Sequence, residues 1–90
     1  MSLQKYNARR DANEPAIVKA LQKIGVFVTR MAKPVDLLCI HRSRVVLAEV
    51  KTATGKLEPA QKDFIAEAGL HGYEIRVWRT VEEAVNEFGG

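Results

Sequence analysis

VDLLCIHRSRVVLAEVK, at residues 35–51, consists of two apolar runs separated by the polar segment His41-Arg42-Ser43-Arg44. Short apolar runs bounded by polar turn residues are typical of strands. Both runs are apolar at consecutive positions, and strands that are apolar on both faces lie in the centre of a sheet. The segment therefore predicts two strands, over 35–40 and 45–50, in a sheet that is covered on each side.

The connection between these strands sets their register. A two-residue turn at Arg42-Ser43 pairs Asp36 with Glu49, and a four-residue loop gives the same pairing, whereas a three-residue loop breaks it. Arg-Ser is not a residue pair that tight hairpin turns favour, so turn chemistry does not choose among these loops. In the first two cases the two carboxylates lie directly opposite each other.

Two acids in facing positions of apolar strands need a partner. Like charges across a sheet repel, and buried carboxylates are unfavourable unless they are paired or bind a metal. Glu49 and Lys51 share a face because alternate side chains do so, and the carbonyl of Val50 is near. Mg²⁺ binds a few carboxylates and completes its octahedron with water and phosphate oxygens. The pattern predicts a Mg²⁺ or Mn²⁺ site formed by Asp36, Glu49 and the Val50 carbonyl.

The chemistry that this set favours is phosphodiester hydrolysis. A bound metal polarises a phosphoryl oxygen and lowers the pKa of a bound water. Lys51 would orient that water or offset developing negative charge. The sequence has no Cys/His zinc cluster and no phosphate-binding glycine loop, which argues against a zinc site and an NTPase. Simpler interpretations exist for each residue alone: a surface ion pair of Glu49 with Lys51, and a turn role for Asp36.

The remaining elements follow from periodicity and capping. Asp11-Ala12-Asn13-Glu14 has the pattern of a capping box, and apolar residues then recur at helical spacing. Thr80 with Glu83 has the same pattern near the end of the chain. We expect helices over about 12–24, 57–70 and after Thr80, and strands over 26–31 and 73–79. The predicted order is αβββαβα.

Composition limits the class of protein. The chain has 90 residues, 47% hydrophobic and 28% charged, which predicts a single domain over 1–90. The formal net charge of +3 suits a polyanionic partner. Cys39 is the one cysteine, so no disulfide forms within the chain. With no leader pattern and no apolar stretch of membrane-spanning length, we expect a cytoplasmic protein without membrane contact, in a bacterium or a phage-infected host.

The motifs resemble those of a known nuclease group. Pro34-Val35-Asp36 with Glu49-Val50-Lys51 is similar to the PD-(D/E)xK motif, although Val35 separates the proline from the acid. Nearly the whole chain resembles the VRR-NUC family in its small, stand-alone, virus-type form. The segments that carry this resemblance are 14–18, 35–38, 47–51, 57–64 and 72–77.

The resemblance implies an α/β fold with a restriction-endonuclease-like core, in which helices flank a mixed central sheet in the order αβββαβα. It implies a metal-dependent DNA endonuclease that acts on branched DNA such as junctions or flaps and forms a homodimer. By the family motif, Glu14 reaches the metal from the first helix, Asp36 and Glu49 are metal ligands, and Lys51 is the catalytic lysine. Gln61 matches a glutamine of the second helix that supports the site.

Six basic residues flank the predicted site in sequence and are candidates for phosphate contacts, which bind without reading bases. They are Arg30, Lys33, Arg42, Arg44, Lys56 and Lys62. A solvated charged rim explains any one of them equally well. Two further hypotheses stay open: a non-catalytic DNA-binding or scaffold module on the same fold, and a nuclease that acts on RNA.

Overall fold

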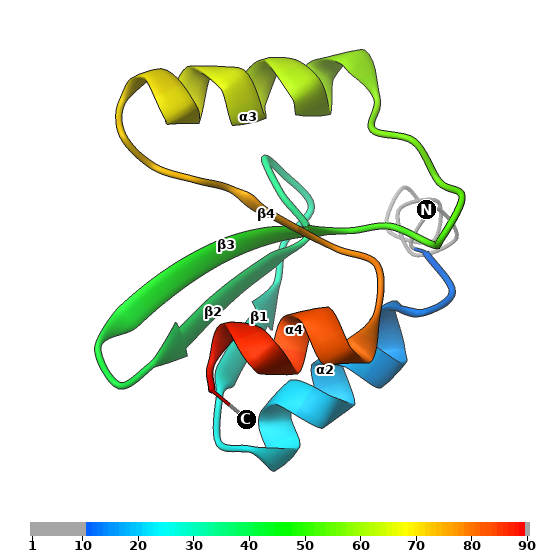
Figure 1. The fold of residues 1–90 in the computed structure, drawn as a ribbon, viewed down its shortest axis with the longest axis vertical. Helices are drawn as coiled ribbons and strands as arrows, with labels where there is room; N and C mark the ends of the chain where they lie inside the picture. The colour runs from blue at the N-terminus through cyan, green and yellow to red at the C-terminus, as the bar shows by residue number, and fades with distance from the viewer. Residues whose placement is uncertain (1–10, 90) are drawn as a thin grey trace.

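The computed structural model describes residues 11–89, which form a mixed α/β fold with a four-stranded mixed sheet flanked by helices (Figure 1). The elements, in chain order, are α2 (Glu14–Lys23), β1 (Phe27–Arg30), β2 (Leu37–His41), β3 (Arg44–Val50), α3 (Pro59–Leu70), β4 (Arg76–Trp78) and α4 (Val81–Glu87). This is the predicted order. The predicted strand over 73–79 is shorter than expected, because residues 73–75 form an arm between α3 and β4.

The sheet has the order β1-β2-β3-β4. β2 pairs with β1 and with β3 in antiparallel fashion, whereas β4 lies parallel to β3. Since β2 and β3 are the inner strands, the predicted central hairpin is confirmed. The ends of β3 and β4 lie next to each other because these strands run in the same direction.

The hairpin has the register that pairs the two acids. Leu37 lies opposite Ala48, and His41 lies opposite Arg44. Arg42 and Ser43 have φ values of 50° and 70°, the positive φ that a two-residue type I′ turn requires at both central positions. Extending this ladder by one residue places Asp36 across from Glu49.

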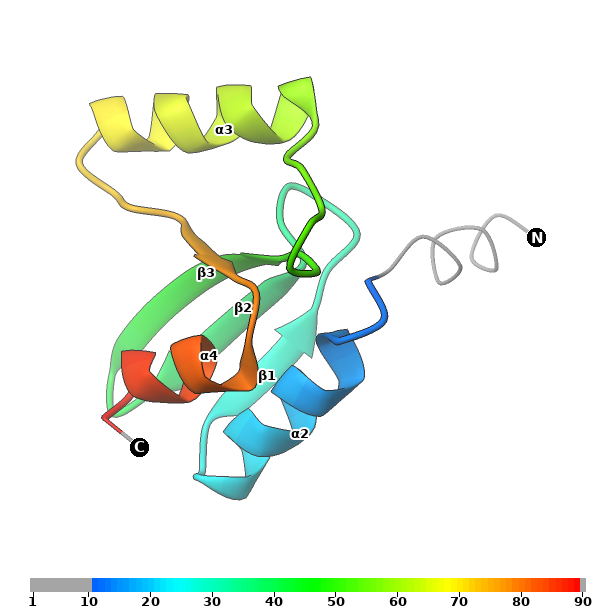
Figure 2. The same ribbon diagram turned by 45° about the vertical axis from the view of Figure 1, so that its right-hand side comes forward.

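One face of the sheet carries the core. α2 and α4 lie side by side on this face (Figures 1 and 2), and Ile17 and Leu21 of α2 are completely buried against it. Cys39 of β2 is also completely buried, and burial raises the pKa of its thiol to about 12. Cys39 is therefore a packing residue and not a reactive thiolate.

The other face of the sheet differs from the prediction. α3 stands away from the sheet in both views (Figures 1 and 2), and none of its residues is buried. Its large apolar side chains are Phe64, Ile65 and Leu70, too few for a wide packing stripe. Phe27 and Val45 are 59% and 50% exposed on this face, so the described residues cover it less completely than we expected.

No helix within residues 11–89 has the length and apolar character that crossing a membrane requires.

Candidate metal centre

Two of the predicted acids meet at one end of the β2–β3 hairpin. Glu49 is the penultimate residue of β3 and is only 1% exposed. Asp36 directly precedes β2, and its Oδ2 accepts a hydrogen bond of 2.7 Å from the Val50 amide. The two carboxyl groups are close enough for the charge of Asp36 to raise the pKa of Glu49. Val35, the residue inserted into the motif, is buried in the core and leaves Asp36 in register with Glu49.

This carboxyl pair has unusual electrostatics. The pKa of Glu49 is raised from 4.5 to about 8, first by burial, then by the charge of Asp36 and by the hydrogen bond between the two carboxyl groups. The charge of Lys51 opposes this shift. With a pKa of about 8, Glu49 keeps its proton at neutral pH, as a buried carboxyl group next to a second one does.

Gln61 joins α3 to the pair. Its Nε2 donates to Glu49 Oε1 at 3.1 Å, and its Oε1 accepts from the Glu58 amide at 2.7 Å. The second bond belongs to the capping box that begins α3, so the start of the helix fixes the orientation of the amide. The family motif implied that Gln61 supports the site, and Gln61 contacts Glu49, one of the two acids.

Lys51 and the Val50 carbonyl lie at the same end of the hairpin as Asp36. Lys51 directly follows β3, and its amide donates to Trp78 O at 3.0 Å. The N–H and C=O of one residue project to the same side of an extended strand. Since the Val50 amide binds Asp36, the Val50 carbonyl also projects toward the Asp36 side.

Glu14 has a different environment. It is buried, 1% exposed, at the first position of α2, and Arg30 Nε donates to its Oε2 at 2.9 Å. Arg30, predicted to contact DNA, is therefore engaged with a predicted metal ligand. Among residues 11–89, no three Asp, Glu, His or Cys side chains gather as a set that could hold one metal ion. The structure assembles Asp36 and Glu49 but does not add Glu14 to them as a third ligand.

Asp11 is a residue of this region that sequence reasoning missed. Its Oδ2 accepts from the Thr52 amide at 2.7 Å, and its charge contributes to the raised pKa of Glu49. The capping box expected over 11–14 is wrong, because the N-cap of α2 is Asn13 and its side chain makes no capping bond. The local sequence is the same whether Asp11 caps the helix or binds a distant segment such as Thr52. The sequence alone therefore could not distinguish these two roles.

The predicted phosphate contacts divide between two ends of the hairpin. Lys33, Lys56 and Lys62 are exposed and lie in the β1–β2 loop, the segment before α3, and α3 itself (Figure 2). Arg42 and Arg44 lie at the turn, the end of the hairpin opposite Asp36. Arg44 also binds the Glu87 carboxylate at 2.8 Å and lies over the Phe88 ring. The three lysines belong to segments away from this turn, and Lys62 follows Gln61, which contacts Glu49.

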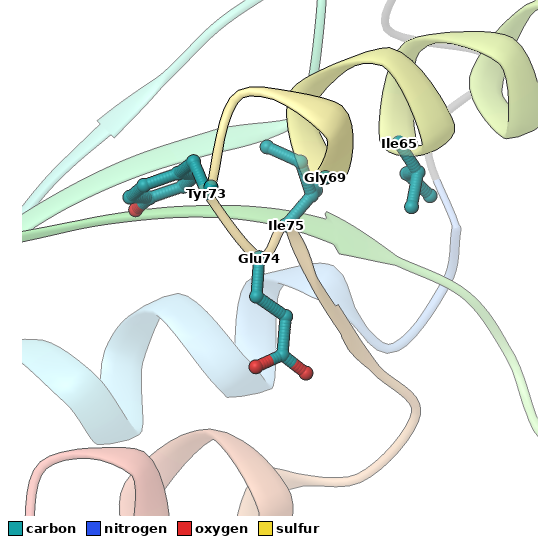
Figure 3. Close-up of a pocket in the computed structure, with 6 residues that line it drawn as sticks. Ile65, Gly69, Tyr73, Glu74 and Ile75 are labelled. Atoms are coloured by element: carbon teal, nitrogen blue, oxygen red, sulfur yellow. The ribbon is translucent and has the colours of Figure 1, made fainter.

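A pocket of about 340 Å³ lies elsewhere, between the second half of α3 and the arm that leads to β4 (Figure 3). Ile65, Tyr73 and Ile75 contribute to its lining, while the Glu74 carboxylate extends away from α3. The pocket includes no predicted site residue and has no group of converging charged side chains.

Two hard carboxylate oxygens fit a divalent cation of the Mg²⁺ type, which commonly takes one or two protein carboxylates and keeps several waters. The raised pKa of Glu49 supports this fit, since the negative charge of Asp36 next to Glu49 favours a cation between them.

No family model matches the sequence, no curated protein matches it, and no solved structure matches the fold. The VRR-NUC resemblance stays a prediction from the motifs.

Proposed function

We propose that this chain is a Mg²⁺- or Mn²⁺-dependent DNA endonuclease of the VRR-NUC type, with a restriction-endonuclease-like fold. One observation carries the proposal. Asp36 and Glu49 form a carboxyl pair at the ends of two neighbouring strands, in which Glu49 is 1% exposed and has its pKa raised to about 8, and Lys51 directly follows.

The burial of Glu49 argues against the simpler interpretation of a surface ion pair with Lys51. Exposed ion pairs contribute little to stability and keep both partners solvated. Glu49 is 1% exposed, and its pKa is raised where a dominant salt bridge would lower it. A divalent cation between the two acids would favour their ionised forms and remove the repulsion between them.

The residues have separate tasks in this proposal. Asp36 and Glu49 would hold the ion, with the Val50 carbonyl available as a further oxygen ligand. The ion, when bound, supplies a polarised phosphoryl oxygen and an acidified water. Gln61 restrains the Glu49 carboxylate, and Lys51 orients the attacking water or offsets negative charge that develops on the phosphate.

The proposed substrate follows from charge and from the family resemblance. Three exposed lysines, Lys33, Lys56 and Lys62, would neutralise backbone phosphates. The resemblance implies selection of DNA shape, such as junctions or flaps, which requires no reading of bases. Cleavage of RNA is an outcome that the same assay tests.

Self-association is part of the proposal. Phe27, Ile40 and Val45 expose apolar surface on the sheet face that α3 does not cover. Exposed apolar patches of this kind often mark protein–protein contacts. We therefore expect a homodimer that buries this face.

One observation favours the alternative, a non-catalytic DNA-binding or scaffold module. Arg30 already compensates Glu14, and the described residues include no group of three metal-ligating side chains. A module of this kind would bind DNA equally well with and without divalent cations.

A cleavage assay separates the two functions. Four-way junctions, flaps and linear single- and double-stranded DNA and RNA are incubated with Mg²⁺, Mn²⁺, Ca²⁺ or a chelator. The proposal predicts cleavage with Mg²⁺ or Mn²⁺ that Asp36→Asn and Lys51→Ala abolish. Glu82→Gln and Lys19→Ala, exposed residues on α4 and α2, are the matched controls that retain activity. Cleavage that survives in Asp36→Asn, or that needs no metal, contradicts the proposal.

A further inference from the structure

Three polar side chains from outside β3 hold the two residues that follow this strand. Asp11 and Asn13 precede the body of α2, and Arg79 directly follows β4. We refer to Asp11, Asn13 and Arg79 as the Lys51 clamp. None of the three was a predicted site residue.

Asn13 ties together the ends of two parallel strands. Its Nδ2 donates to the carbonyl oxygens of both Lys51 and Arg79, each at 3.0 Å. Two carbonyl contacts identify this atom as the amide nitrogen, since an oxygen in its place would be repelled. The Lys51 amide donates to Trp78 O at 3.0 Å, so both backbone polar groups of Lys51 are bound.

The next residue is fixed in the same way. The Thr52 amide donates to Asp11 Oδ2 at 2.7 Å. The Arg79 guanidinium donates to the carbonyl oxygens of Thr52 and Gly55, each at 2.6 Å. The backbone N–H and C=O of Lys51 and of Thr52 therefore all have partners, and the clamp supplies three of the four.

Asn13 makes these bonds at a cost to its own helix. It occupies the N-cap of α2, where an asparagine side chain normally accepts an amide hydrogen bond, yet it makes no such bond. Its Oδ1 is buried and has no hydrogen-bond partner among the described residues. Buried unsatisfied acceptors are unfavourable. The Asn13 side chain therefore donates to the carbonyl of Lys51, while its own Oδ1 is buried and caps no helix amide.

We propose that Asn13, assisted by Asp11 and Arg79, is a positioning residue for Lys51. The clamp fixes the peptide group that follows the Lys51 Cα, and the Trp78 carbonyl holds the one that precedes it. Together these bonds limit where the ammonium can lie relative to Glu49. Asn13 acts through the backbone and touches no reacting group. The catalytic part of this inference rests on the proposed nuclease function, whereas the backbone part does not.

The test compares two variants that remove the Asn13 donor. Asn13→Asp keeps the shape and adds a charge that suits a helix N-terminus, while Asn13→Ala removes the donor without a charge. Both are expected to lower kcat by about 10- to 100-fold, with KM changed by less than about twofold, because small misplacements of a catalytic group reduce the chemical step. Asn86→Asp, at an exposed asparagine of α4, is the matched control and leaves both constants unchanged.

Amide hydrogen exchange supplies a readout that needs no activity. In both Asn13 variants, exchange at the Lys51 and Thr52 amides is expected to accelerate, while the amides of β2 keep their protection. Unchanged exchange at Lys51 and Thr52 overturns the inference, as does a loss confined to KM. If the wild-type protein cuts no nucleic acid, the exchange result still decides whether Asn13 positions Lys51. If Asn13→Ala does not fold, Arg79→Lys tests the clamp through its second member, since it keeps the charge and removes the guanidinium that donates to the Thr52 and Gly55 carbonyls.

Discussion

Asp36 lies across from Glu49 at the ends of β2 and β3, although both are acids and Glu49 is 1% exposed. A proton on the Glu49 carboxyl group, or a cation beside both groups, relieves the repulsion between them. Binding of a metal ion would therefore displace the Glu49 proton.

The stability of the metal-free protein should fall as pH rises. Burial and the neighbouring Asp36 raise the pKa of Glu49 from 4.5 to about 8 in the folded chain. Between these values the folded state keeps a proton that the unfolded state releases, so the free energy of unfolding decreases with pH by at most about 1.4 kcal/mol per unit. Urea unfolding across this range measures the slope. Glu49→Gln should remove it, and a stability that rises with pH in the wild type contradicts the assignment.

Gln61→Ala should weaken metal binding. The variant removes the 3.1 Å hydrogen bond that orients the Glu49 carboxylate. Loss of a group that orients a metal ligand typically lowers metal affinity by about 10- to 100-fold. Calorimetric titration with Mn²⁺ measures the change, with Gln22→Ala on the exposed side of α2 as its control. Equal affinities in the two variants would show that Gln61 has no such role.

The position of each basic residue should determine its effect on DNA affinity. Lys33→Ala, Lys56→Ala and Lys62→Ala are each expected to lower affinity and to reduce the salt dependence of binding by about one ion per lost phosphate contact. Arg42→Ala, at the far end of the hairpin, should leave both quantities unchanged. Fluorescence anisotropy at several salt concentrations, with Ca²⁺ in place of Mg²⁺, measures them. A larger effect for Arg42→Ala would place the DNA at the other end of the sheet.

Val45→Lys should produce a monomer. Val45 is 50% exposed on the uncovered sheet face, and a lysine there would have to be desolvated in an interface. Sedimentation equilibrium measures the oligomeric state. Val81→Lys, at a 37% exposed valine that begins α4, is the control that should remain dimeric. A wild-type protein that stays monomeric at every concentration refutes the proposed interface.

Local patterns predicted the elements and the hairpin register. Alternating and continuous apolar runs specify strands directly, and the pairing of Asp36 with Glu49 follows from a turn that involves only Arg42 and Ser43. The proximity of Gln61 to Glu49 came instead from the family motif. These features depend on neighbouring residues or on a recognisable motif, so they could be predicted from the sequence.

Contacts between distant segments were not predictable in the same way. Asn13 binds Lys51 across 38 residues, and Asp11 binds Thr52 across 41, yet locally both resemble helix caps. The separation of α3 from the sheet depends on how few apolar side chains it carries, and the helical pattern alone did not reveal this. Arg42 and Arg44 were grouped with the site by sequence distance, although the hairpin carries them to its opposite end.

The central claim is that Asp36 and Glu49 hold a divalent cation in exchange for the proton that Glu49 keeps at neutral pH. Calorimetric titration of Mn²⁺ near neutral pH, repeated in two buffers that differ in ionisation enthalpy, measures ion binding and proton release together. We predict that each chain binds one ion and releases close to one proton, and that Asp36→Asn loses both signals. Absence of Mn²⁺ binding, or binding that persists unchanged in Asp36→Asn, would contradict the account.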